Sequence, residues 1–289
     1  MYFAVHLPPT GNYAHVRTLA TLARDAEGAG WDGFFLWDHV AFGLQAPWAA
    51  DPWIALAAIA LTTQRIKLGP MVTPLPRRRP AKLAREAVSL DHLSGGRLIL
   101  GVGIGGGAWE WDDLGEVADL QARGRMLDEG LEVLSGLWRA EPFSYHGEYF
   151  TVHETLFLPP PLQAPRIPIW IAGNWPNRAP FRRAARWDGA FPLGKGLLFD
   201  QMLAPAEIAA TGAYIRQYRS RGTPFEMAHW GITRGADPVA DLARVAPYEA
   251  AGVTWWFENI NPWRFGWQGD GAWPVEQMNE RIRRGPPRI

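Results

Sequence analysis

The sequence alternates about eight times between short apolar runs and longer segments whose apolar residues recur at helical spacing. Such alternation is typical of parallel strands joined by crossover helices. Eight units in one chain favour the closed ring of a (β/α)8 TIM barrel, an α/β fold. We expect strands at residues 3–7, 33–37, 66–69, 98–102, 167–172, 187–191, 227–231 and 253–257. We expect helices at residues 16–26, 53–63, 120–138, 207–219, 239–251 and 275–283, and one that begins at Pro80.

The length of 289 residues fits one such domain, because (β/α)8 barrels commonly run to about 250 residues. The chain has no evident repeat, linker or low-complexity segment, so we expect a single domain over residues 1–289. Strand-like runs on both sides of His146-Gly147 predict a short hairpin excursion between the fourth and fifth strands. Residues 193–203 follow no pattern and are interpreted as a mobile loop.

The composition excludes several classes of function. Equal numbers of basic and acidic residues, 29 each, argue against a nucleic-acid partner. The absence of cysteine excludes disulfides and thiolate metal sites, and the seven histidines show no metal-ligand spacing, so no metal is expected. The N-terminus lacks the pattern of a signal peptide, and no apolar run reaches membrane-spanning length. We therefore expect a cytoplasmic protein with no membrane association.

A glycine-rich segment follows the expected fourth strand. Its residues 101–106 have the spacing GxGxxG, but residues 109–113 separate them from the next helical pattern, which disfavours a dinucleotide-binding fold. The segment ends in Glu110, at the strand end where α/β barrels place their ligands. The residues at the other expected strand ends would surround the same mouth of the barrel. They are His6, Asp38-His39, residues 71–73, residues 173–175, residues 194–195 and Glu258-Asn259.

His39 and Glu110 are the candidate catalytic residues. Histidine titrates near neutrality, and either Asp38 or Glu110 can set its tautomer. Glu110 can orient His39 or bind the edge of a cofactor ring. The alternatives are that His39 only binds backbone groups and that Glu110 is an acid at a helix N-terminus, where the helix dipole favours it. His6 is a candidate for the same proton-transfer role as His39, with weaker support.

The basic run Arg77-Arg78-Arg79 can meet a phosphate or an acidic tail, but such a run is more often a solvated loop, which we favour here. Lys195 and a group of arginines in one helical segment are alternative phosphate contacts. That group consists of Arg178, Arg182, Arg183 and Arg186.

The segment 93–105 reads L-S-x-G-R-hydrophobic-x-L-G-x-G-x-G, and Glu110-Trp111 and Gly115 follow it. In these motifs the chain resembles the bacterial luciferase-like monooxygenase superfamily of flavin- and deazaflavin-dependent oxidoreductases. Further matches are residues 28–32, 37–39, 137–138, 147–150, 159–165 and 168–173, together with Arg125. The resemblance is good over about residues 1–195 and loose beyond them. Gly106 and Gly107 stand where the family often has a large aromatic residue.

The resemblance implies a non-proline cis peptide in a bulge at the end of the third strand, matched here by Met71–Val72. An isoalloxazine-type ring would pack against this bulge. The cofactor-binding residues implied at the mouth are Asp38, Met71, Val72, Thr73, Gly105, Gly106, Gly107, Gly173, Asn174, Trp175, Gly194 and Lys195.

Two cofactors are known in the family: the deazaflavin coenzyme F-420, a hydride carrier, and reduced FMN with molecular oxygen. The pair Asp38-His39 is frequent in the deazaflavin branch, so the resemblance favours coenzyme F-420 and a small organic substrate. A barrel that binds flavin without turnover remains an alternative. A carbohydrate-active barrel, with Glu110 and Glu258 as paired carboxylates, is a weaker one.

The expected second helix is apolar on more than one face, with Trp48 and Trp53 near its start and Ile54, Leu56, Ile59 and Leu61 along it. Because an outer apolar face must be covered, we expect a homodimer that forms through residues 48–62. The alternative is that residues 142–165 or the C-terminal tail cover this face within one chain.

Overall fold

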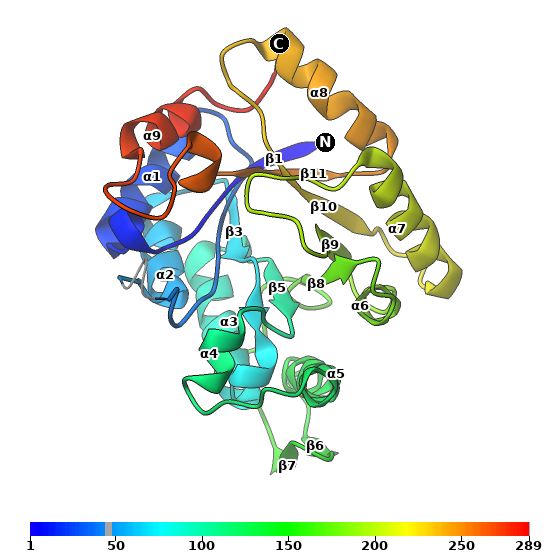
Figure 1. Ribbon diagram of the computed structural model, residues 1–289. Helices are drawn as coiled ribbons and strands as arrows, with labels where there is room; N and C mark the ends of the chain where they lie inside the picture. Colours follow the sequence, from blue (N-terminus) through cyan, green and yellow to red (C-terminus); the bar gives the residue numbers. More distant parts are fainter. Residues whose placement is uncertain (44–47, 289) are drawn as a thin grey trace.

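The computed structural model describes residues 1–43 and 48–288. Its barrel strands are β1 (Tyr2–Leu7), β2 (Gly33–Leu36), β3 (Lys67–Pro70), β4 (Thr73–Pro74), β5 (Leu100–Gly103), β8 (Ile169–Trp175), β9 (Gly189–Gly194), β10 (Glu226–Gly231) and β11 (Trp255–Asn259). They pair in parallel in the order β3-β2-β1-β11-β10-β9-β8-β5-β4. Because β3 and β4 are halves of one broken strand, and Leu68 also pairs with Leu98, the sheet forms a nearly closed barrel (Figure 1). The predicted (β/α)8 architecture is confirmed.

The helices are α1 (Val16–Gly28), α2 (Pro52–Thr62), α3 (Pro80–Ser94), α4 (Ala108–Asp112), α5 (Leu120–Leu137), α6 (Ala179–Ala184), α7 (Pro205–Tyr218), α8 (Pro238–Ala250) and α9 (Val275–Arg283). Local sequence sets several of their ends. The Asp51 carboxylate accepts a hydrogen bond from the Ile54 N–H at the start of α2, with Pro52 in the first turn. Gly95, at φ +66°, ends α3 in the left-handed conformation that glycine adopts readily. Within residues 1–43 and 48–288, no helix combines the length and apolarity needed to cross a membrane.

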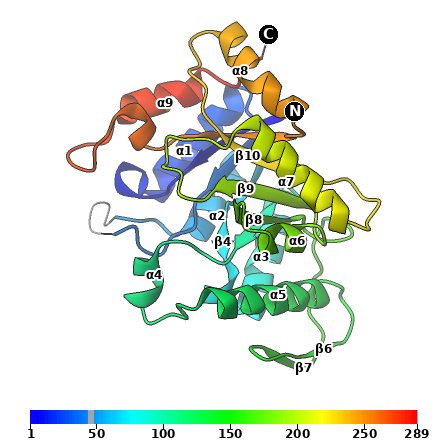
Figure 2. The ribbon, with the colours of Figure 1, turned by 45° about the vertical axis from the view of Figure 1, so that its right-hand side comes forward.

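The hairpin between the fourth and fifth barrel positions is present. Its strands β6 (Phe143–His146) and β7 (Thr151–Thr155) pair antiparallel. Figures 1 and 2 place this hairpin beside α5, on the side away from the barrel. The excursion therefore adds to the outer surface and contributes nothing to the barrel mouth.

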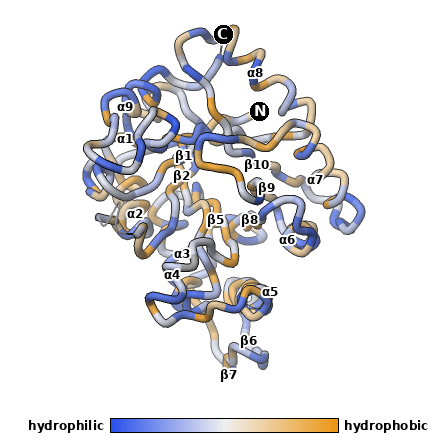
Figure 3. Tube along the Cα trace, in the orientation of Figure 1, coloured by the Kyte–Doolittle hydropathy of each residue, from blue (hydrophilic) through white to orange (hydrophobic). Residues whose placement is uncertain are grey.

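Two apolar clusters lie on the two faces of the barrel wall. The inner cluster includes Phe35, Trp170, Phe191, Trp255 and Phe257. The larger outer cluster fills the space between the strands and the helices. Figure 3 shows apolar residues along the strands and hydrophilic ones along the outer helices. Since neighbouring residues of a strand face opposite sides, this division decides which side chains reach the mouth.

Candidate active site

His39 and Glu110 are in direct contact at the carboxyl ends of the strands. His39 follows β2, and Glu110 lies in α4, the short helix after β5. The two side chains meet with 2.9 Å between His39 Nδ1 and Glu110 Oε2. Gly107, at φ +65°, precedes α4 and permits the sharp turn that brings Glu110 back toward His39.

The surroundings of Glu110 favour its ionised form. Its Oε1 accepts hydrogen bonds from the backbone N–H groups of Val40, at 2.7 Å, and Ala41, at 3.2 Å. Arg77 Nη1 lies 3.4 Å from the same oxygen. Burial alone would raise the pKa of Glu110, but the hydrogen bond from His39 and the charges of His39 and Arg77 outweigh it and lower that pKa. An ionised Glu110 can only accept, so His39 donates Nδ1–H to it and presents Nε2 as the other ring nitrogen.

Asp38 holds the third strand, and its carboxylate has no hydrogen bond with the His39 ring in the described residues. Its Oδ2 accepts hydrogen bonds from Thr73 Oγ1, at 2.6 Å, and from Arg78 Nη2, at 2.9 Å. Trp53 Nε1 lies 3.3 Å from the same oxygen. Of the two acids considered for setting the histidine tautomer, Glu110 makes the contact, while Asp38 joins β2 to β4 and α2.

The expectation of a solvated basic loop is wrong for Arg77 and Arg78. The Arg77 side chain is 5% exposed and lies between Glu110 and Asp38. Arg78 pairs with Asp38, whereas Arg79 is exposed. Two buried carboxylates at the mouth therefore each have a guanidinium beside them, which offsets the unfavourable burial of their charge.

The bulge between β3 and β4 contains the predicted cis peptide at Met71–Val72. His6 Nε2 donates a hydrogen bond to the Met71 carbonyl, at 2.9 Å, and burial lowers the pKa of His6 to about 4 despite this bond. His6 is therefore neutral near pH 7 and fixes the bulge from inside the barrel. A Cβ on Gly101 would lie 2.5 Å from Met71 Sδ, so a glycine in β5 is required for this packing.

Several buried polar atoms around the mouth have no hydrogen-bond partner among the described residues. Besides Nη1 and Nη2 of Arg77, which lies beside Glu110, they include His6 Nδ1, Trp37 Nε1, Trp230 Nε1 and Asn259 Oδ1. Of these last four, two are donors and the other two, with His6 donating through Nε2, are acceptors. A planar ring with carbonyl and N–H groups on its edge, such as that of a flavin or deazaflavin, would satisfy such a set, so these residues fit the implied cofactor.

A pocket of about 350 Å³ opens beside this cluster, and its lining includes Gly107, Asn174 and Gly194. Of the expected trio at the end of β8, only Asn174 borders the pocket. A Cβ on Gly173 would meet Pro180 of α6, and Trp175 packs on Phe181 of the same helix.

The remaining implied cofactor contacts differ in their surroundings. Lys195 is exposed, and its backbone N–H binds the Trp175 carbonyl. Trp111 lies against Gly105 and donates Nε1–H to the Gly106 carbonyl.

No sequence pattern pointed to the aromatic residue that covers the mouth. Phe199, in the connection between β9 and α7, packs against Trp37, Trp230 and Trp263, with ring centroids 5.4, 6.2 and 4.6 Å away. Its carbonyl accepts hydrogen bonds from the side-chain amide of Asn259 and that of Asn261, each at 2.9 Å. The segment 193–203, interpreted from the sequence as a mobile loop, is thus attached to the mouth through the ring and the carbonyl of Phe199.

Replacing Phe199 with alanine is expected to release this connection. The Phe199 ring contacts three tryptophans at the mouth. Its loss would destabilise the closed position of this segment by at least ~1.4 kcal/mol, which raises the equilibrium constant for local opening tenfold. Hydrogen exchange of residues 195–203 should therefore quicken by about tenfold or more. Leu198→Ala removes a neighbouring, 65% exposed side chain and serves as the control. Equal exchange in the two variants would contradict the role given to Phe199.

Glu258 faces away from the mouth, which removes the pair required for a carbohydrate-active barrel. It is fully buried between the strands and the outer layer, and its Oε1 lies 2.7 Å from Arg264 Nη1 and 3.3 Å from Arg281 Nε. Thr233 and Trp256 also donate hydrogen bonds to it. Glu258 belongs to a buried ion cluster and is not opposed to Glu110.

The sequence matches the luciferase-like monooxygenase family over residues 1–236. An uncharacterized protein of Mycobacterium tuberculosis is 32% identical over 185 residues, which cover 58% of this chain and 62% of that protein. The oxygenase component of a flavin-dependent trigonelline monooxygenase from Acinetobacter baylyi is 30% identical over 160 residues, covering 55% of this chain and 44% of that protein. The chain thus spans less than two thirds of the length of these curated relatives.

Two solved structures share the fold over nearly the whole chain. A monooxygenase from Streptomyces bottropensis has a TM-score of 0.73 and 21% identity, covering 98% of this chain and 97% of that one. The coenzyme F-420-dependent tetrahydromethanopterin reductase from Methanopyrus kandleri has a TM-score of 0.74 and 17% identity, covering 98% and 96%. With a family match that includes every strand through β10, the chain belongs to the luciferase-like monooxygenase family.

Proposed function

We propose that the chain is an oxidoreductase that binds coenzyme F-420 at the barrel mouth and transfers hydride to or from a small organic substrate. The observation that carries the proposal is the His39–Glu110 pair, which lies at the same mouth as the Met71–Val72 bulge and its unpartnered polar atoms. Family membership supports an oxidoreductase with a flavin-type cofactor, without choosing between coenzyme F-420 and FMN.

When bound, the cofactor would supply the hydride chemistry, and the chain would position and shield it. Met71, Val72 and Asn174 would hold the ring, while Gly107 and Gly194 would allow close backbone approach. His39 Nε2 would give or take a proton at the substrate, with Glu110 holding the opposite ring nitrogen. Phe199 and the residues around it would exclude water from the mouth.

The alternative is a monooxygenase that uses reduced FMN and molecular oxygen. The similarity to the trigonelline monooxygenase component, named as flavin-dependent, supports it. The Asp38-His39 pair supports coenzyme F-420 instead, by the family resemblance. A barrel that binds flavin without turnover has less support, because Glu110 and His39 are both present and in contact.

Reconstitution with each cofactor distinguishes these proposals. The purified protein would be titrated with coenzyme F-420 and with FMN, and each complex assayed for hydride transfer without oxygen and for oxygen uptake with the reduced cofactor. We expect tighter binding of coenzyme F-420 and turnover in the absence of oxygen. Turnover only with reduced FMN and oxygen would establish the alternative, and binding without turnover of any reductant would favour the non-catalytic barrel. The proposal includes a cytoplasmic location, consistent with a chain that has no cysteine.

We also propose a homodimer that forms through the outer face of α2. Ile54 and Leu61, two turns apart on this helix, are 63% and 67% exposed. The C-terminal helix α9 packs against α1, and the hairpin strand β6 packs against α5. The two intrachain covers considered for α2 therefore lie elsewhere in the described part of the chain.

The double variant Ile54→Lys/Leu61→Lys is expected to be monomeric, because two charges would be buried in the apolar interface. Sedimentation at micromolar concentration would measure the mass of the wild type and of the variant. Val239→Lys places a lysine at an equally exposed apolar position on α8 and should leave the dimer intact. A monomeric wild type, or a dimer that survives the double change, would refute the proposed interface.

A further inference from the structure

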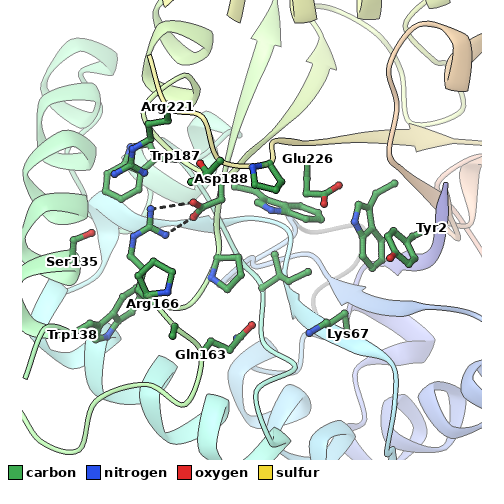
Figure 4. A pocket seen from close by; sticks show the side chains of 18 of the residues that line it. Tyr2, Lys67, Ser135, Trp138, Gln163, Arg166, Trp187, Asp188, Arg221 and Glu226 are labelled. Carbon is green, nitrogen blue, oxygen red and sulfur yellow. Dashed lines mark hydrogen bonds and ion pairs between the residues drawn. The ribbon is translucent and has the colours of Figure 1, made fainter. Parts of the chain in front are cut away.

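A second cavity, of about 1590 Å³, opens at the amino ends of the strands, at the opposite end of the barrel from His39. We call it the basal cavity; its lining includes Tyr2, Lys67, Ser135, Arg166, Trp187 and Glu226. Figure 4 shows Tyr2, Lys67 and Glu226 on one side and Ser135, Trp138 and Arg221 on the other, with the Arg166–Asp188 ion pair between them. No part of the proposed oxidoreductase function uses these residues.

The first of these sides has an aromatic surface. Tyr2 and Trp255 stack with their ring centroids 4.8 Å apart and their planes at 28°. Trp170 meets Trp255 edge-on at 5.7 Å. Trp170 and Trp255 are nearly fully buried, whereas Tyr2 is 53% exposed. A planar ring entering the cavity would therefore find the exposed side of the Tyr2 ring, which Trp255 holds in place from behind.

The charges that line the basal cavity are unbalanced. Arg166, Arg186 and Arg288 each pair with an aspartate. Four further cationic side chains of the lining have no ion pair among the described residues, namely Arg65, Lys67, Arg139 and Arg221. Two carboxylates of the lining, those of Glu132 and Glu226, also have no ion pair within residues 1–43 and 48–288. The excess of positive charge favours an anionic ligand.

Donors without a partner also lie in this lining. Trp187 Nε1 and Ser135 Oγ are buried and have no hydrogen-bond partner in the described part of the chain. Lys67 Nζ has one, the Gly96 carbonyl at 3.3 Å, although an ammonium has three protons to donate. Burial lowers the pKa of Lys67, and a bound anion would offset that effect.

We propose that the basal cavity is a second binding site, for a flat organic monoanion such as an aromatic carboxylate or sulfonate. The ring of the ligand stacks on Tyr2, which Trp255 supports from behind, and its charge lies at Lys67. Glu226 also lines the cavity and disfavours a second negative charge, which selects monoanions over dianions.

Fluorescence titration with anilinonaphthalene sulfonate, an aromatic monoanion, tests the proposal, with benzoate as the competitor. The wild type should bind the dye, and benzoate should displace it. Lys67→Met is expected to raise the dye Kd by at least about tenfold, because a charged contact is lost. Tyr2→Ala should weaken binding as well, through the lost stacking surface. Lys82→Met changes an exposed lysine on α3 and should leave the Kd unchanged.

Lys195→Met distinguishes the basal cavity from the mouth, since Lys195 lies at the other end of the barrel. Loss of dye binding in that variant, with full affinity in Lys67→Met, would overturn the proposal, and so would the absence of dye binding by the wild type. Thermal melting would verify that each variant is folded. If Lys67→Met does not fold, Tyr2→Ala decides, because its half-exposed side chain can be removed with little effect on the core.

Discussion

Replacing His39 with alanine is expected to reduce turnover by roughly 10²- to 10⁴-fold, the usual contribution of a positioned general acid or base. The buried carboxylate of Glu110 holds Nδ1 of the His39 ring, which leaves Nε2 as the nitrogen for proton transfer to or from a substrate. The backbone contacts of Glu110 with Val40 and Ala41 do not require the His39 ring. The loss should therefore appear in kcat and leave the fold and the affinity for the cofactor largely unchanged.

Glu110→Gln should also reduce turnover, because Glu110 holds the proton on His39 Nδ1. The amide can still occupy the site, but it removes the negative charge that fixes Nδ1–H and balances Arg77. We therefore expect a smaller decrease than for His39→Ala, and no further decrease when the two changes are combined, because both remove one unit of function.

Steady-state kinetics at saturating cofactor, supported by a direct binding titration, would measure these effects. His15→Ala alters an exposed histidine that lies before α1 and serves as the control. Unchanged kcat in His39→Ala would exclude a catalytic role for this residue. Fully additive losses in the double variant would instead mean that His39 and Glu110 act separately.

The barrel was predictable because its signal is repeated. Each strand buried on both faces appears as an apolar run, and each helix between strands shows its own periodicity. The ends of individual strands were less predictable. β8 continues to Trp175 and β9 to Gly194, each three residues beyond its expected end, because the added residues of the two strands pair with one another. The short helix α4 was anticipated only in the alternative that placed Glu110 at a helix N-terminus, since five residues are too few to show a period.

The site was predictable only where chain order places residues at strand ends. His39 and Glu110 follow β2 and β5, so a closed barrel brings them to one mouth whatever the loops do. Arg77 and Arg78 were misjudged because a run of arginines does not reveal which carboxylates will be buried beside it. Phe199 was missed because an aromatic residue in a connection without periodicity gives no sign of the ring cluster that it joins.

Replacing Glu258 with glutamine is expected to destabilise the fold by about 3–5 kcal/mol, the usual effect of removing one partner from a buried ion pair. Arg264 and Arg281, whose side chains are 5% and 2% exposed, would lose their only carboxylate in the described residues. Urea unfolding would measure the change in the free energy of unfolding. Glu276→Gln removes a carboxylate whose side chain is 82% exposed and should change it by less than ~1 kcal/mol.

The wild type and Glu258→Gln should also differ in the pH dependence of their free energy of unfolding. Burial would raise the pKa of Glu258, but the charges of Arg281 and Arg264 and the hydrogen bond from Thr233 outweigh it, so that pKa is lowered in the folded chain. A lowered pKa adds stability above the unfolded value of about 4.3 and loses it as the pH falls through the folded value. The difference between wild type and Glu258→Gln should therefore be full at neutral pH and shrink in acid. A difference that stays constant down to the acid unfolding of the wild type would mean that the effect of the variant comes from packing and not from the charge of Glu258.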